Sequence, residues 1–241
     1  QICHWCPECR TVISDLETEE RDVAGNLWHI CYKGVANAPD VTVATTRPET
    51  LLGDTGIAVH PNDKRWKDAV GKYVDVPLVG RTIQIVADSY ADPEMGSGAV
   101  KLTPCHDPND YAVGEQHGLE QIQVIGFDGK MTEAAGKYCG MDRYECREKL
   151  LDDLSKSGHL VETVEHIHAV PHHDKCGTVI EPLPMEQWFM NMKDLAKVTR
   201  EVLEENQIEY VPSRFRDYAI DWLDNIRDWA LSRQIWCGHR I

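Results

Sequence analysis

Short runs of β-branched and aromatic residues alternate with turn-forming residues along most of the chain, a pattern typical of β-strands. Residues 37–40, Asn-Ala-Pro-Asp, predict a turn between the first two runs. Many short strands separated by Gly and Pro favour a barrel-like or mixed sheet. The runs that predict strands are residues 27–32, 41–46, 56–59, 82–86, 99–102 and 121–125.

Helical signals are fewer and become frequent only toward the C-terminus. Asp107 predicts an N-cap that is followed by proline and stopped by Gly118, and residues 142–158 combine a capping-box-like start with apolar residues at every fourth position. Beyond about residue 190, two amphipathic helices are predicted, with a boundary before them. Their apolar faces are Leu195, Val198 and Val202 on the first, and Tyr218, Trp222, Ile226 and Trp229 on the second.

Composition narrows the classes of protein that fit this pattern. The 241 residues, 42% hydrophobic and 27% charged, suit one large or two small globular domains, with no apolar run long enough to cross a membrane. The start of the chain has neither a methionine nor a signal peptide, so we expect a segment cut from a longer cytoplasmic protein. A net charge of −15 argues against binding nucleic acid mainly through phosphate neutralisation. It still allows a local site to bind one nucleotide end.

Two segments gather polar side chains at the ends of predicted strands. The first is Thr45-Thr46-Arg47-Pro48-Glu49-Thr50, and the second runs from Lys101 through Thr103, His106 and Asp107 to Asp110. Taken singly, these residues also suit a polar turn, a solvated strand position and a plain N-cap worth about 1 kcal/mol. Taken together, they favour a site for a polar substrate.

Both segments resemble the signature segments of the editing domains of valyl-tRNA synthetases, to which the isoleucyl and leucyl editing domains are related. The resemblance extends over essentially the whole chain. It implies an α+β fold of the editing-domain type with a barrel-like mixed β core, a zinc-ribbon-like base and C-terminal helices. Further matching segments are residues 5–7, 14–17, 179–182, 187–189, 227–229 and 232–236.

The resemblance also implies a division of the chain and an activity. Residues 1–20 and 165–190 would form the zinc-ribbon-like connection, residues 21–164 the editing core, and residues 191–241 a helical return toward a catalytic domain. The ATP-binding motifs of such synthetases, His-Ile-Gly-His and Lys-Met-Ser-Lys-Ser, do not occur in the chain. We therefore expect hydrolysis of threonine from mischarged tRNA(Val), with no ATP site and no aminoacylation.

Chemistry explains why such a hydrolase needs polar groups. A hydrophobic pocket rejects an isostere with an added hydroxyl by only about a hundredfold, so a second site must favour the hydroxyl of threonine over the methyl of valine. The resemblance implies that Asp110 binds the α-ammonium group, that Asp107 and Thr103 contact the threonine hydroxyl, and that Lys101 serves the ester or the terminal ribose. The substrate-binding set it implies for the terminal adenosine is Thr45, Thr46, Arg47, Glu49 and, in the place of a phenylalanine, Met95.

The sequence leaves open which group activates the attacking water. An aminoacyl ester is already activated, so positioning supplies much of the rate. His106 is a general base by its ordinary pKa. A hydrogen-bonding scaffold role for His106 and activation of water by the substrate's own ribose hydroxyl are the alternatives.

Cysteine spacing points to a metal. The chain has nine cysteines, and Cys6 and Cys9 form a Cys-x-x-Cys pair. Relatives carry a second such pair where this chain has His173 and Cys176, which implies a structural zinc held by Cys6, Cys9, His173 and Cys176. Four protein ligands leave no open position for water. The alternatives are His172 in place of His173, and a metal-free turn.

Two other functions stay open from the sequence. A zinc-ribbon binding module without catalysis would explain the thiols but not the cluster from Lys101 to Asp110. Editing of the isoleucine or leucine type would use the same segments on a different amino acid. The expected partners are the 3′ end of tRNA(Val) carrying threonine and the rest of a synthetase, with no membrane.

Overall fold

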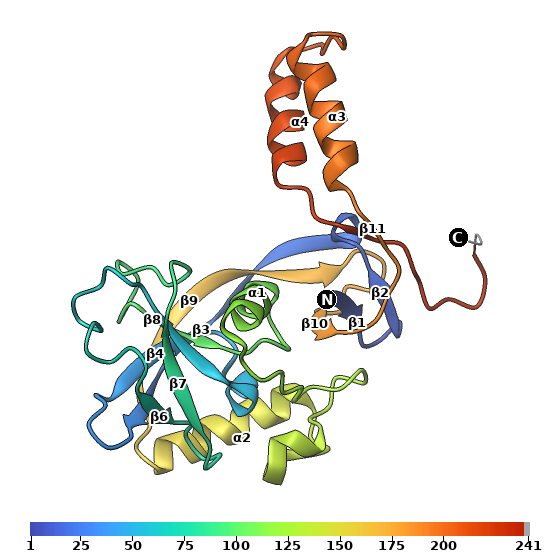
Figure 1. The fold of residues 1–241 in the computed structure, drawn as a ribbon. Coiled ribbons are helices and arrows are strands. Elements are labelled where there is room, and N and C mark those ends of the chain that lie inside the picture. Colours follow the sequence, from blue (N-terminus) through green and yellow to red (C-terminus); the bar gives the residue numbers. More distant parts are fainter. Residues whose placement is uncertain (239–241) are drawn as a thin grey trace.

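The computed structural model describes residues 1–238 and has a mixed α+β fold, as expected from the sequence (Figure 1). The strands are β1 Ile2–Cys6, β2 Thr11–Ile13, β3 Thr18–Gly34, β4 Val41–Thr45, β5 Gly56–Val59, β6 Tyr73–Asp75, β7 Thr82–Ala87, β8 Ala99–Leu102, β9 Leu160–His173, β10 Glu181–Pro184, β11 Phe189–Met190 and β12 Trp229–Ala230. The helices are α1 Pro108–His117, α2 Arg143–Lys156, α3 Lys193–Glu204 and α4 Arg214–Asp224, with 3₁₀ turns η1 Asp15–Glu17, η2 Pro48–Gly53 and η3 Glu133–Tyr138.

The largest unit is a seven-stranded mixed sheet in the order β4-β3-β6-β7-β5-β8, with β9 paired to β3. Only β5 and β7 run parallel, and the other pairs are antiparallel. Helix α2 packs on the core of this sheet through Cys146, Leu150 and Leu154, which are fully buried. The four-residue spacing of these side chains therefore predicted the buried face of α2 correctly. The barrel-like closure of the sheet stays a prediction.

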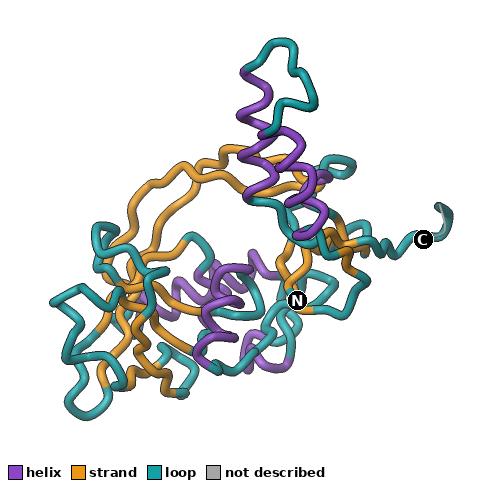
Figure 2. Tube along the Cα trace, turned by 45° about the horizontal axis from the view of Figure 1, so that its top comes forward, coloured by secondary structure: helices purple, strands orange, loops and turns teal. Residues whose placement is uncertain are grey.

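Strands β3 and β9 continue beyond the sheet as a long two-stranded arm (Figures 1 and 2). The antiparallel ladder runs from Thr18 opposite His173 to Ile30 opposite Leu160. At its far end lies a three-stranded sheet in the order β10-β1-β2, with its own small core. The chain therefore passes between the two sheets twice, once along β3 and once along β9.

Helices α3 and α4 form a hairpin that projects away from both sheets (Figures 1 and 2). The second predicted helix is shorter than expected, because α4 ends at Asp224. The side chain of Asn225 donates to the carbonyl of Asp221, and Trp229 then pairs with Met190 between β12 and β11. Ile226 and Trp229 are therefore not part of the helical face, and the prediction was wrong there.

The strand predicted over residues 121–125 is also wrong. Only Ile125 forms a bridge, to Met131. The backbone amides of Val124 and Ile125 donate to the imidazole of His106 instead of to a neighbouring strand. Within the residues that the structure describes, the helices are too short or too polar to cross a bilayer.

Candidate functional site

Lys101 lies at the end of β8 in a sealed cluster of polar side chains. Its ammonium group donates to Thr50 Oγ1 at 2.9 Å, to Asp54 Oδ1 at 3.2 Å and to Thr103 Oγ1 at 2.5 Å. Tyr32 donates its hydroxyl to the other oxygen of Asp54 at 2.5 Å. The side chains of Lys101 and Asp54 are 9% and 0% exposed. The ammonium group is thus committed to internal acceptors.

Helix α1 begins at a pair of carboxylates. Asp107 caps the helix and accepts from the backbone N–H groups of Asn109 at 2.7 Å and Asp110 at 3.1 Å. Asp110 is buried and accepts from the backbone N–H of Thr103 at 2.8 Å, which connects α1 to the Lys101 cluster. Burial raises the pKa of Asp110 to about 7; the charge of Asp107 also raises it, and the charge of Lys101 opposes the shift.

His106 belongs to the second predicted segment and is buried. Its Nε2 accepts from the backbone N–H groups of Val124 at 2.9 Å and Ile125 at 3.3 Å. Burial lowers the pKa of His106 to about 3, and the positive charges of Arg47 and Lys101 lower it further. The ring is therefore neutral at pH 7, and its basic nitrogen Nε2 already accepts two backbone N–H groups. This arrangement favours a hydrogen-bonding scaffold role for His106 over a general-base role.

Arg47 is the N-cap of η2 and reaches across to the second segment. Its backbone N–H donates to Thr45 Oγ1 at 3.0 Å, and its guanidinium donates to the carbonyl of His106 at 3.4 Å. The same guanidinium pairs with Glu181 at 2.6 Å and with Glu49 at 3.3 Å. Arg47 is thus held by residues from η2, β10 and the turn before α1.

The two glutamates extend this arrangement into a network of five charged groups. Arg147 donates to both carboxylate oxygens of Glu49 at 2.8 Å, and Arg143 donates to Glu181 at 2.6 Å. Both glutamates are almost fully buried, and the charges of Arg147 and Arg47 outweigh burial and lower the pKa of Glu49. We call these five residues the arginine network.

A cavity of about 430 Å³ lies under the β3–β9 arm and contacts both predicted segments. Thr46 and Arg47 line it from the first segment, and His106 and Asp107 line it from the second. Lys101, Thr103 and Asp110 are buried and do not line it. Met95 is 72% exposed and does not line this cavity.

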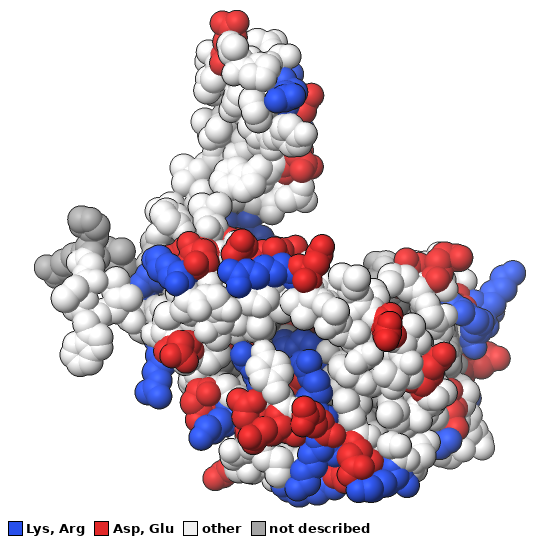
Figure 3. Space-filling view, turned by 180° about the vertical axis from the view of Figure 1, so that it is seen from behind, with Lys and Arg blue, Asp and Glu red and all other residues white. Residues whose placement is uncertain are grey.

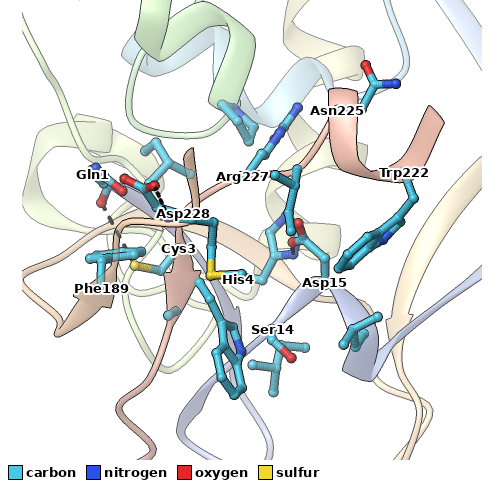
Figure 4. A pocket seen from close by; sticks show the side chains of 18 residues that line it. Gln1, Cys3, His4, Ser14, Asp15, Phe189, Trp222, Asn225, Arg227 and Asp228 are labelled. Carbon is cyan, nitrogen blue, oxygen red and sulfur yellow. Dashed lines mark hydrogen bonds and ion pairs between the residues drawn. The ribbon is translucent and has the colours of Figure 1, made fainter. Parts of the chain in front are cut away.

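A second cavity of about 390 Å³ lies between the β1–β2 sheet and the end of α4. His4, Asp15, Trp222 and Arg227 are among the side chains that line it (Figure 4). Pro108 of the second predicted segment lines this cavity, and no residue of the first segment does. It shares His4 and Pro108 with the cavity under the arm.

The predicted zinc ligands come together at the junction of β1, β2 and β9. The ligand atoms of Cys6, Cys9, His173 and Cys176 all lie within 4.8 Å of one another. Cys176 Sγ is 3.5 Å from Cys6 Sγ and 3.2 Å from His173 Nδ1. Burial would raise the pKa of Cys176, but hydrogen bonds from Thr178 lower it to about 6, which favours the thiolate that a metal needs.

His172, the alternative ligand, is placed differently. Its Nδ1 lies 2.7 Å from the carbonyl of Val170, and it lines the cavity under the arm. A Cys₃His donor set at this spacing fits a tetrahedral metal ion such as zinc. The cluster could therefore hold a metal ion.

Several functional residues were missed by the sequence reasoning. Asp54 received no role from the sequence, although a carboxylate between apolar runs signals a buried partner. The partners of Arg47 come from η2, β10 and the turn before α1, and no spacing in the sequence joins those segments. Tyr90 lies beside the helix start, where burial and the carboxylates of Asp110 and Asp107 raise its pKa.

Comparison with known proteins gives the family. The family model of class I tRNA synthetases (I, L, M and V) matches residues 1–241, so the chain belongs to this family. Over its whole length the chain is 52% identical to valine–tRNA ligases of Clostridium tetani and Symbiobacterium thermophilum, and over 240 residues it is 48% identical to that of Thermotoga maritima. It spans only 27%, 26% and 28% of the lengths of these relatives.

Proposed function

We propose that this chain is an editing domain that hydrolyses the ester of mischarged threonyl-tRNA(Val) at the 3′ end of the tRNA. The observation that carries the proposal is the meeting of two polar segments distant in sequence. Arg47 contacts the carbonyl of His106, and Lys101 contacts Thr50. The similarity to valine–tRNA ligases supports the choice of tRNA and of the amino acid to be removed.

The start of α1 provides the groups that recognise the amino acid in this proposal. Asp110 binds the α-ammonium group, and the carboxylate of Asp107 accepts the hydroxyl of threonine. A valyl ester brings a methyl group to the same carboxylate and leaves it unsatisfied, at a cost of about 1–3 kcal/mol. Selectivity therefore arises from the missing hydroxyl partner and not from size.

Lys101 and Thr103 act as positioning residues in this proposal. Their polar atoms are engaged with Asp54, so they fix the end of β8 and, through the Thr103 N–H, the carboxylate of Asp110. His106 holds residues 124–125 in place. Water then attacks an ester that is positioned by the protein, with the ribose hydroxyl of the substrate as the activating group.

The terminal adenosine lies over the turn that precedes η2. Thr45 and Glu49 hold Arg47 in place, and Thr46 and Arg47 face the cavity. Met95, being exposed, offers only a mobile apolar contact to the adenine. The chain acts on a ready-made ester in the cytoplasm and needs no ATP site.

The division of the chain follows the proposed function. Residues 1–20 and 165–190 form the connection that the metal ion braces, residues 21–164 form the editing core, and residues 191–241 return toward a synthetase body. The last three residues of that return lie outside the described residues. A zinc ion on Cys6, Cys9, His173 and Cys176 would supply structural bracing and no catalysis, since the four ligands complete its coordination.

Deacylation of purified threonyl-tRNA(Val) by the chain tests the proposal. We expect Asp110→Ala and Lys101→Ala each to slow hydrolysis at least tenfold, on the order of 1.4 kcal/mol or more in activation free energy. The exposed Lys33 provides the matched control, and Lys33→Ala should hydrolyse at the wild-type rate.

Ester specificity separates the proposal from its alternatives. Threonyl esters should be hydrolysed faster than valyl or norvalyl esters. Faster hydrolysis of valyl or norvalyl esters would instead indicate editing of the isoleucine or leucine type. Hydrolysis no faster than in buffer would leave a binding module without catalysis.

A further inference from the structure

Helix α1 carries the carboxylate that the proposed function assigns to the substrate, yet few apolar contacts hold this helix. Its buried residues are Asp110, Val113 and Gly114, and of these only Val113 has an apolar side chain. Gly114 allows a close approach to the segment before the helix, since a Cβ at this position would lie 2.8 Å from the side chain of Pro104. Polar contacts at the two ends of α1 therefore contribute much of its positioning.

An ion pair holds the C-terminal end of α1. His117 is the last residue of the helix, its Nε2 lies 2.8 Å from Asp88 Oδ2, and the two side chains are 22% and 8% exposed. Burial would raise the pKa of Asp88, but hydrogen bonds from the backbone N–H of Tyr90 and from His117 outweigh burial and lower this pKa. Asp88 is therefore a carboxylate, which only accepts, so His117 donates from Nε2.

The spacing along α1 connects this ion pair to the proposed substrate contact. Asp110 and His117 are seven positions apart, so they lie on the same face of the helix about two turns, or roughly 10 Å, from each other. Asp110 accepts from the backbone N–H of Thr103 near the start of α1, and His117 donates to Asp88 at its end. A helix that is bonded at both ends of one face cannot slide or rotate without breaking one of the two contacts.

The turn 88–91 that carries Asp88 is itself fixed to the large sheet. The backbone N–H of Asp88 donates to the carbonyl of Val59 on β5 at 2.9 Å, and the second carboxylate oxygen of Asp88 accepts from the backbone N–H of Tyr90 at 2.9 Å. Ala91 of the same turn packs with Val113 of α1 in one apolar cluster. The sheet therefore determines where the end of α1 lies.

The Asp88–His117 pair differs from the ion pairs at the surface. Lys and Arg atoms lie beside Asp and Glu atoms over much of the face seen from behind (Figure 3). Exposed pairs, such as Lys33 with Asp40 at 54% and 52% exposure, compete with water and contribute little. Asp88 is buried and bonded on both carboxylate oxygens, so its contact with His117 has a fixed direction.

We propose that Asp88 and His117 are positioning residues of the proposed ester site, because their pair fixes α1 and with it the Asp110 carboxylate that faces the α-ammonium group of the substrate. The inference rests on the proposed function, which assigns that ammonium group to Asp110. Neither residue lines the cavity under the arm, so the pair acts through Asp110 and not on the substrate itself. A displacement of about 1 Å in such a contact can slow a reaction about a hundredfold.

Hydrolysis of threonyl-tRNA(Val) measures the role of the pair. We expect His117→Ala to lower kcat/KM roughly tenfold, because the end of α1 is released. His117→Gln keeps an N–H donor in the place of Nε2 and should stay within about twofold of wild type. The matched control is His159, which lies between α2 and β9 with its Nδ1 2.7 Å from the carbonyl of Cys31, and His159→Ala should hydrolyse at the wild-type rate.

An Asp110→Ala background separates positioning from a general effect on the fold. Adding His117→Ala to Asp110→Ala should change kcat/KM by less than about twofold, because the carboxylate that the pair positions is absent. A further loss of roughly tenfold would overturn the inference, since His117 would then act independently of Asp110. If His117→Ala does not fold, as judged by its urea midpoint, His117→Asn takes its place, because its polar side chain is too short to reach Asp88.

Titration of Asp110 keeps this inference distinct from the proposed function, because it needs no substrate. The side-chain carboxyl carbons of aspartate are labelled for NMR, and Asp110→Asn identifies the Asp110 signal. The pKa of Asp110 should be about 7 in wild type, and His117→Ala should lower it toward 3.8, since a loosened α1 admits water. If wild type hydrolyses no threonyl ester, the proposed function fails, while this titration still decides the role of the pair. An unchanged pKa of Asp110 in a folded His117→Ala chain would remove that role.

Discussion

The Lys101 cluster and the arginine network both contain buried charges, and they differ in their access to water. The Lys101 cluster is closed, with Lys101 and Asp54 at 9% and 0% exposure. The arginine network lies equally deep at its glutamates, but Arg47 and Arg147 remain 29% and 25% exposed toward the cavity. The polar groups of the Lys101 cluster bond only to one another, whereas the arginine network presents part of its charge to the cavity.

This difference separates fold maintenance from recognition. A closed ion pair must satisfy every donor internally, because the desolvation of an unpaired charge costs several kcal/mol. An open network can exchange a protein partner for water or for a phosphate. We therefore expect changes in the closed cluster to act mainly on stability, and changes around the open network to act mainly on binding.

The largest effect is expected in the closed cluster. Asp54→Ala leaves the Lys101 ammonium buried without its counter-charge, which should lower the free energy of unfolding by about 3–5 kcal/mol. Urea unfolding followed by circular dichroism measures it. Asp40, which pairs with Lys33 at the surface, is the matched control, and Asp40→Ala should change little. Equal effects of the two substitutions would remove the distinction between closed and exposed pairs.

A smaller effect is expected when the metal cluster is broken. Glu181 lies on β10 shortly after Cys176, so loss of the metal ion should loosen the support of Arg47 without reaching the Lys101 cluster. Cys176→Ser should remove about one zinc per chain, lower the free energy of unfolding on the order of 1–3 kcal/mol and speed hydrogen exchange in β10 but not in β8.

The exposed Cys139, outside the metal cluster, provides the control for this substitution. Cys139→Ser should keep the metal and the exchange rates of wild type. Zinc-free wild-type protein, by elemental analysis after purification in zinc-containing buffer, would contradict the metal assignment and leave a turn with incidental thiols.

Local signals in the sequence were enough for much of the fold. The Asp107 cap and the Gly118 stop predicted α1, which runs from Pro108 to His117. Alternation of β-branched residues located most strands of the large sheet, because propensity and burial agree there. Residues 121–125 have the same pattern, yet their amides bond to the His106 ring, and this competition is decided by tertiary contacts.

The candidate site was predictable in its parts but not in its arrangement. The motifs marked Arg47 and Lys101, and the cysteine spacing marked Cys6 and Cys9, because each signal lies within a few residues. What each side chain contacts depends on segments far away in sequence, as with Glu181, which lies 134 positions from Arg47. The sequence therefore suggested Lys101 as a substrate contact, whereas its ammonium group is saturated inside the protein.

A pH dependence distinguishes Asp110 from the closed cluster behind it. Its pKa of about 7 in the folded protein lies above the ordinary value of 3.8, so the folded state holds the proton more tightly than the unfolded state. The stability that this carboxyl contributes is fully present below about pH 3.8 and is lost as the pH rises through about 7. The slope reaches at most about 1.4 kcal/mol per pH unit.

Asp110→Asn isolates this carboxyl from all other titrating groups. The free energy of unfolding of wild type, measured relative to Asp110→Asn in urea, should fall between pH 4 and pH 7. Binding of the α-ammonium group needs the carboxylate, so kcat/KM for threonyl ester hydrolysis should rise over the same range in wild type and stay flat and low in Asp110→Asn. Parallel pH profiles of the two proteins would place the titrating group elsewhere and take the ammonium contact away from the start of α1.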